Sequence, residues 1–151
     1  MSDLRRLAAA LATALALLAP AAQAQGEPVG YVKTVTGDAW VVTSGQMAKA
    51  APGMPVMAGS ELHTMAGATL GIALKDDTSL SLGPNTQLRV EEFAYAPAEG
   101  KLGLVMAMAR GTLAYVSGII AKLRPEAVQL RTPSGIIGVR GTEFAAKVEA
   151  P

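Results

Sequence analysis

Residues 68–90 read ATLGIALKDDTSLSLGPNTQLRV, and through most of this stretch apolar residues alternate with small or polar ones. The alternating apolar residues are Leu70, Ile72 and Leu74, then Leu80 and Leu82, then Leu88 and Val90. A period of two is the signature of a β-strand with one buried face. Asp76-Asp77 and Gly83-Pro84-Asn85 are turn-forming sequences that separate the three runs. The stretch therefore predicts three short strands joined by tight turns.

Similar patterns predict further strands on both sides of this stretch. They cover residues 29–36, 39–43, 102–108, 112–117, 128–132 and 143–148. Proline and glycine predict an irregular connection over 47–59, a loop at 97–100 and a turn at Arg110-Gly111, while residues 119–123 fit either a helical turn or a strand. The sequence thus predicts an all-β domain of short strands, either sandwich-like or a twisted β-solenoid, and alternation alone does not choose between them.

The N-terminus has the features of a helical signal peptide. Arg5 and Arg6 supply positive charge, residues 7–19 are apolar, Pro20 follows them, and Ala22-Gln23-Ala24 has the small-x-small pattern of a cleavage site. The apolar run is shorter than the roughly 20 residues that a membrane-spanning helix needs. We therefore expect residues 1–24 to be removed on export, leaving one domain over residues 25–151 in the periplasm or outside the cell, with no stable membrane span.

Composition narrows the possible partners. Arg5, Arg6 and Asp3 lie in the expected leader, so the 13 Lys and Arg and the 12 Asp and Glu of the chain leave 11 of each sign in the mature domain. The two signs are interspersed along the sequence, so no basic stripe is available to neutralise phosphates, and nucleic acid is not an expected partner. The chain has no cysteine, which excludes thiol catalysis and thiolate metal sites.

Residues that suggest chemistry have simpler structural explanations. His63 is the only histidine, and beside Glu61 it would suit a general base or a metal ligand, although a lone histidine in a strand is more often a surface residue. Asp76, Asp77 and Asn85 carry oxygens that suit calcium, but such residues are commoner as turn formers. The sequence therefore predicts no catalytic residues, no metal site and no cofactor, and we expect the protein not to be an enzyme.

Several motifs, in order, resemble those of the FecR family over residues 29–148. They are Gly30-x-Val32, Thr36-Gly37-x-Ala39, Gly59-Ser60-x-Leu62-x-Thr64, Leu74-x-Asp76-x-Thr78-x-Leu80-x-Leu82, Gly83-Pro84-Asn85-Thr86, Arg110-Gly111-x-Leu113-x-Tyr115-x-Ser117-Gly118 and, after Thr132-Pro133, Arg140-Gly141-Thr142-x-Phe144. The chain departs from the family pattern at Ser60, where aspartate is usual, and at Asp77, where glycine is usual. The resemblance implies a periplasmic β-solenoid-like domain, and it favours the solenoid over the sandwich.

The resemblance also supplies the candidate site. It implies a signature with a mainly structural role: Thr132, Pro133, Gly138, Arg140, Gly141, Thr142, Phe144, Asp76, Gly83 and Asn85. For Arg140 we weigh two roles, hydrogen bonding to loop carbonyls or to Glu143 within the fold, which we favour, and binding of a partner's carboxylate.

FecR-type regulators join this domain to a membrane helix and a segment that binds a sigma factor, and we expect this chain to be a stand-alone form without either. Its expected function is protein–protein binding in periplasmic signalling or envelope sensing, with another periplasmic or envelope protein as partner. A strand added to an exposed sheet edge is the expected binding mode. A carbohydrate or surface-polymer binding module, with Trp40 in an aromatic row, and a structural envelope subunit are the alternatives, and an oligomer is compatible with all three.

Overall fold

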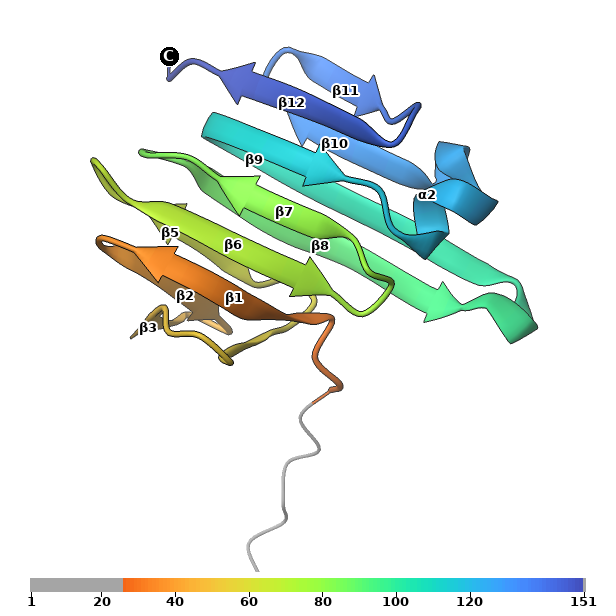
Figure 1. The fold of residues 1–151 in the computed structure, drawn as a ribbon, viewed down its shortest axis with the longest axis horizontal. Helices are drawn as coiled ribbons and strands as arrows, with labels where there is room; N and C mark the ends of the chain where they lie inside the picture. Colours follow the sequence, from red (N-terminus) through yellow and green to blue (C-terminus); the bar gives the residue numbers. More distant parts are fainter. Residues whose placement is uncertain (1–25, 151) are drawn as a thin grey trace, which may run out of the picture.

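A computed structural model describes residues 26–150 (Figure 1). The expected signal peptide lies outside the described residues. The strands are β1 (Gly30–Thr36), β2 (Ala39–Thr43), β3 (Gln46–Lys49), β4 (Pro55–Val56), β5 (Glu61–Thr64), β6 (Thr69–Leu74), β7 (Ser79–Leu82), β8 (Gln87–Ala96), β9 (Lys101–Val116), β10 (Val128–Thr132), β11 (Gly135–Gly138) and β12 (Glu143–Val148). Helix α2 (Ile119–Leu123) and the 3-10 turns η1 (Pro97–Glu99) and η2 (Pro125–Ala127) complete the described chain. The predicted all-β class is confirmed.

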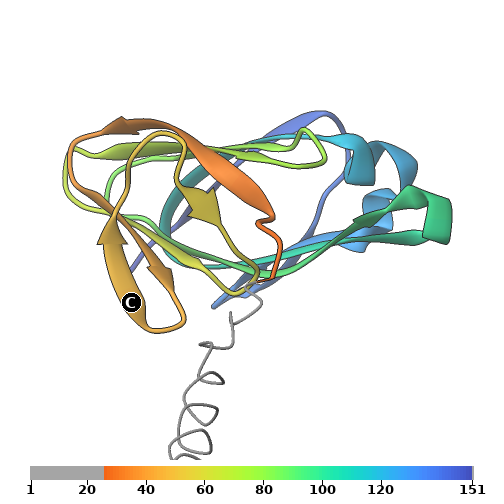
Figure 2. The ribbon, with the colours of Figure 1, turned by 90° about the horizontal axis from the view of Figure 1, so that it is seen from below.

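The strands form a curled, mainly antiparallel sheet with the shape of a half-barrel (Figures 1 and 2). Its main path runs β3-β2-β5-β8-β9-β7-β6-β1-β4. The long strand β9 belongs to both layers, because its first part pairs with β8 and β10 and its last part pairs with β7 and β12. We call the layer of β1, β4, β6, β7 and β12 the first layer and the layer of β2, β3, β5, β8, β10 and β11 the second layer.

Both layers contribute to one apolar core. Leu70, Ile72 and Leu74 on β6 are buried and alternate with more exposed residues, as the sequence pattern predicts. Leu62, Leu88 and Met106 face them from the second layer and are fully buried. Full burial of each large aliphatic side chain contributes roughly 1.5–3 kcal/mol, so this shared interior holds the two layers together.

The turn predicted at Arg110-Gly111 is wrong, because β9 runs without a break from Lys101 to Val116. Gly111 has a φ of 103°, and a Cβ atom there would overlap the backbone and side chain of Thr86. An Arg-Gly pair in the sequence indicates a turn, whereas here the glycine lets one strand continue through the place where it passes from the second layer to the first.

Other parts of the chain also differ from the sequence analysis. The expected irregular connection contains β3 and β4, and residues 119–123 form α2. The solenoid is not confirmed, since the strands pair antiparallel within a curled sheet, apart from the parallel pair of β9 and β10, and do not stack as successive parallel rungs. Within residues 26–150, no helix has the length and apolar character needed to span a bilayer.

Candidate functional site

The segment from Thr132 to Phe144 forms one border of the curled sheet. Thr132 ends β10, Pro133 lies in the exposed turn that follows, and the Thr132 hydroxyl donates a hydrogen bond of 3.0 Å to the carbonyl of Gly135. This turn reverses the chain into β11, which pairs antiparallel with β10 from Gln129↔Gly138 to Thr132↔Gly135. The first signature residues therefore build a hairpin whose second strand is β11.

Strand β11 is an edge strand with exposed apolar side chains. It pairs with β10 alone, and every second residue of such an edge points its backbone N–H and C=O away from the sheet. Ile136 and Ile137 are 64% and 40% exposed. An apolar pair of this kind usually belongs to a core, so its exposure at an unpaired edge marks β11 as a candidate binding element.

The two isoleucines face opposite sides of the sheet. Ile136 is opposite Arg131 on the outer face, and Ile137 is opposite the fully buried Leu130 on the inner face. A hollow of about 550 Å³ lies on the outer side, lined by residues that include Ile136, Gly138 and Arg140. A second hollow, of about 590 Å³, lies between the β10–β11 hairpin and the end of β12. Both sides of the edge are therefore open to a ligand.

Arg140 follows β11 and is exposed. Its guanidinium makes no hydrogen bond and no ion pair with any residue from 26 to 150, so the contact to Glu143 or to loop carbonyls, which the favoured structural role requires, is not present. Gly138 ends β11, and a Cβ atom there would have no neighbour within 4 Å. These two signature residues lie at the surface beside the candidate binding edge.

The last signature residues anchor the segment to β9. Ser117 donates from its backbone nitrogen to the Thr142 carbonyl and from its hydroxyl to the Gly141 carbonyl, both at 2.8 Å. The ring of Phe144 stacks on Tyr115 with centroids 4.8 Å apart. Burial raises the pKa of Tyr115. Gly141, Thr142 and Phe144 thus hold the C-terminal end of the segment in place.

Asp76 supports α2. Its carboxylate is fully buried and accepts hydrogen bonds from the Thr78 hydroxyl at 2.8 Å, the Thr78 amide at 3.2 Å and the Ile120 amide at 3.1 Å. Its carbonyl accepts a further bond of 2.7 Å from the amide of Ile119. The side chain therefore fixes both its own turn and the first turn of α2.

Gly83 and Asn85 lie in the turn after β7. The Gly83 carbonyl accepts hydrogen bonds from the hydroxyls of Thr64 at 2.6 Å and Thr86 at 2.8 Å. Asn85 takes a φ of 54°, which asparagine tolerates better than most residues. Because β7 separates Asn85 from Asp76 and Asp77, these three residues cannot ligate one cation together.

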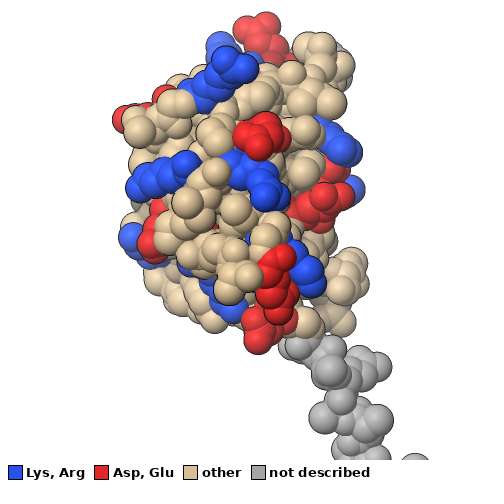
Figure 3. All heavy atoms as spheres, turned by 90° about the vertical axis from the view of Figure 1, so that its right-hand side faces the viewer, with Lys and Arg blue, Asp and Glu red and all other residues tan. Residues whose placement is uncertain are grey.

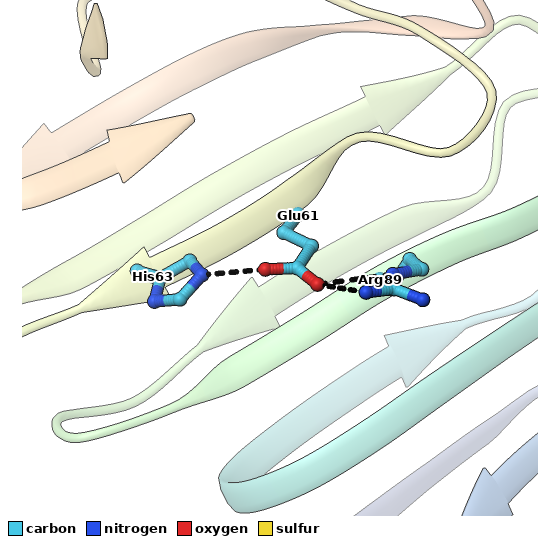
Figure 4. Close-up of polar contacts among 3 residues, drawn as sticks. All are labelled: Glu61, His63 and Arg89. Atoms are coloured by element: carbon cyan, nitrogen blue, oxygen red, sulfur yellow. Dashed lines mark hydrogen bonds and ion pairs between the residues drawn. The ribbon is translucent and has the colours of Figure 1, made fainter. Parts of the chain in front are cut away.

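Glu61 and His63, which the sequence analysis paired, belong to a polar network on the outer face of the second layer, and its third member, Arg89, was not foreseen. Glu61 and His63 are two residues apart on β5, and Glu61 is opposite Arg89 on β8. Figure 4 shows the Glu61 carboxylate between the other two side chains, with one oxygen 3.0 Å from Nε2 of His63 and the other 3.1 Å from Nε of Arg89. The i, i+2 spacing of Glu61 and His63 was a usable signal, whereas the partner strand was not evident.

This network predicts a weak loss of stability in acid. The hydrogen bonds from Arg89, and then from His63, hold the pKa of Glu61 below its usual value. The stabilisation of the fold by ionised Glu61 is therefore complete above the unfolded-state pKa of this carboxyl group. It is lost as the pH falls through the folded-state pKa. We expect Glu61→Gln to lower Tm slightly at pH 7 and by less near pH 3, because ordinary carboxyl pKa values lie between these two pH values. Thermal unfolding of both proteins across this range measures the difference, and an equal difference at the two ends would contradict the assignment.

Residues that suggested other functions are dispersed. Tyr31 and Phe93 are the other aromatic residues that could join Trp40; Tyr31 lies on β1 in the first layer, whereas Trp40 on β2 and Phe93 on β8 lie in the second layer. Residues 26–150 hold no group of three or more acidic or histidine side chains arranged to bind a metal. Figure 3 shows that positive and negative side chains are intermixed over the end of the molecule that it displays.

Comparison with known proteins agrees with this organisation. The family model described as FecR protein matches residues 60–151, which cover most of the strands and the whole border from Thr132 to Phe144. No curated protein and no solved structure matches the chain. FecR proteins are associated with periplasmic signalling and are not known as enzymes. The match extends over more than half of the sequence, and the chain therefore belongs to the FecR family.

Proposed function

We propose that this protein is an exported, non-enzymatic binding domain that takes part in periplasmic signalling. Its leader, residues 1–24, is removed on export. The mature domain binds an extended segment of another periplasmic or envelope protein, which adds as a strand to the free edge of β11. Main-chain hydrogen bonds supply affinity in this binding mode, and pockets for alternate side chains supply specificity.

The observation that carries the proposal is that the edge of β11 lacks the charge and the proline that normally prevent strand addition. Edge strands are protected by charged side chains, by proline or by being very short. The other free edges follow this rule: β3 carries Lys49, β4 has two residues and contains Pro55, and β12 carries Glu143 and Lys147. Strand β11 reads Gly-Ile-Ile-Gly and contains neither a charge nor a proline.

The exposure of the two isoleucines also supports β11 as the edge to which the partner binds. With Ile136 64% and Ile137 40% exposed, an added strand would cover apolar surface on both faces. Burial of such surface contributes roughly 25 cal/mol per Å². A partner with alternating apolar residues matches this surface, because its side chains also point to the two faces in turn.

Site-specific photo-cross-linking in cells that make the protein natively tests the proposal. A photoreactive phenylalanine analogue replaces Ile136 in one version and the exposed Ser81 of β7 in a control version. We expect a discrete adduct with one envelope protein from position 136 and none from position 81. Adducts of the same proteins from both positions, or none from either, would contradict the proposal, and an adduct with a second copy of the chain would identify the edge as an oligomer contact.

Charge on the edge is expected to abolish binding without unfolding the domain. Ile136→Lys places an ammonium group on the exposed face of β11, where it would have to be desolvated beneath an added strand. We expect Tm to change little, because the side chain is mostly exposed, and the adduct from a photoreactive residue at position 137 to disappear. An adduct of unchanged yield would exclude strand addition at this edge.

A further inference from the structure

At residue 138 the outer hollow beside β11 is lined by backbone alone. Gly138 is opposite Gln129 and Ile136 is opposite Arg131, so both lie on the outer face of β11; the next residue, Val139, is buried at 4%, and Arg140 is exposed. The hollow of about 550 Å³ is lined by Ile136, Gly138 and Arg140 together with residues of η2 and β10.

The fold itself does not require glycine at position 138. The φ of Gly138 is not among the positive values of the described chain, and a Cβ atom there would have nothing within 4 Å. Gly118 provides the contrast, because a Cβ atom there would overlap the backbone of Asp76 and Thr78. At Gly138 the absent side chain leaves space at the surface and relieves no clash.

Charge at the rim of the hollow indicates what the space receives. Arg140 has no carboxylate within 4.0 Å among residues 26–150, and its planar fork of donors suits a carboxylate better than any neutral group. Glu126, on η2, lines the same hollow and disfavours a second carboxylate on its own side. A ligand that fits this surface carries an apolar group over Gly138 and one negative charge directed at Arg140.

We propose that the hollow over Gly138 is the specificity pocket of the strand-docking edge, and that its ligand is an extended peptide segment with a large apolar residue followed or preceded, two positions away, by aspartate or glutamate. This inference rests on the proposed function. Residues i and i+2 of a strand share a face and lie roughly 6.5–7 Å apart. Gly138 ends β11 and Arg140 follows two residues later, so an added strand that runs past the end of β11 can bring two side chains of one face near these two residues.

A peptide array tests the pocket directly. The protein, expressed with its own leader and purified after export, is applied to peptides of about ten residues in which valine and threonine alternate. Two outward positions, i and i+2, are varied independently. We expect the wild-type protein to favour Leu, Phe or Met at one position and Asp or Glu at the other, by about tenfold over peptides with Ala and Lys, which corresponds to about 1.4 kcal/mol.

Two variants separate the parts of the pocket. Arg140→Glu is expected to reverse the charge preference from acidic to basic peptides. Gly138→Leu is expected to fill the hollow and remove the preference for a large apolar residue. Gly103→Leu is the matched control, because Gly103 also lies in a strand of the second layer, has an ordinary φ, and would place its Cβ 3.9 Å from that of Ala94. It should bind like the wild type.

The outcomes distinguish the inference from the proposed function. If no peptide binds the wild-type protein, strand addition itself fails. If peptides bind with no preference at the two positions, or if the preferences survive in both Arg140→Glu and Gly138→Leu, the specificity pocket is contradicted. Strand addition at the edge of β11 would still be supported. Should Gly138→Leu not fold, Arg140→Glu carries the test, because it changes only an exposed side chain.

Discussion

Replacing Gly111 with alanine is expected to destabilise the domain by about 3 kcal/mol or more. Its φ of 103° is a conformation that residues with a side chain rarely adopt, and the added Cβ would overlap Thr86. Thr86 cannot move freely, since its hydroxyl donates to the Gly83 carbonyl at 2.8 Å and accepts from the amide of Thr112 at 3.0 Å. The substitution therefore disturbs the point at which β9 joins the two layers.

Urea unfolding of the purified variant measures this loss, with Gly103→Ala as its control. Gly103 lies in the same strand, has room for a Cβ atom and has an ordinary φ. We expect the control to change the free energy of unfolding by less than about 1 kcal/mol. Similar values for the two variants would show that Gly111 has no special role in the passage of β9 between the layers.

Replacing Asp76 with alanine is expected to cost about 3 kcal/mol or more. The substitution leaves the amides of Thr78 and Ile120 and the hydroxyl of Thr78 without their acceptor. These donors are buried, so water cannot replace the carboxylate without a rearrangement of the turn and of α2.

The neighbouring residue supplies the control for Asp76. Asp77 is exposed and has a φ of 67°, which glycine adopts more easily than aspartate. Asp77→Gly is therefore expected to leave the free energy of unfolding within about 1 kcal/mol of the wild-type value. If both variants unfolded at the same urea concentration as the wild type, the buried carboxylate would not be a structural anchor.

Regular alternation made part of the fold predictable. Strands β6 and β7 follow from Leu70 to Leu82, because every second residue there is buried against the opposite layer. Strands β1, β2, β10 and β12 also lie where the sequence predicts strands, β10 because a proline follows it. A period of two specifies which side chains face inward, and this information is local to each strand.

The pairing of the strands was not predictable in the same way. Strand β9 has four partners, and the choice among them depends on segments that are distant in the sequence. Strands β3 and β4 were missed because they are short and lie among glycine and proline residues, which usually indicate loops. The curled sheet, in place of a solenoid, follows from these long-range pairings and not from any single segment.

The signature contains two kinds of residue that the sequence could not separate. Phe144 stacks on the buried Tyr115, and the buried carboxylate of Asp76 accepts hydrogen bonds. Gly138 and Arg140 lie at the surface without such contacts. The sequence does not identify Ile136 and Ile137 as binding residues, because an apolar pair between glycines is equally typical of a core strand.

Amide hydrogen exchange in the border from Thr132 to Phe144 tests most directly the central claim that a partner adds as a strand to β11. The protein is measured alone and saturated with the best-bound peptide from the array. If that peptide adds as a strand to β11, exchange will slow in residues 135–138 and stay unchanged in the free edge β3. Slowing in β3, or slowing nowhere in residues 135–138, would show that the partner does not bind by pairing with this edge.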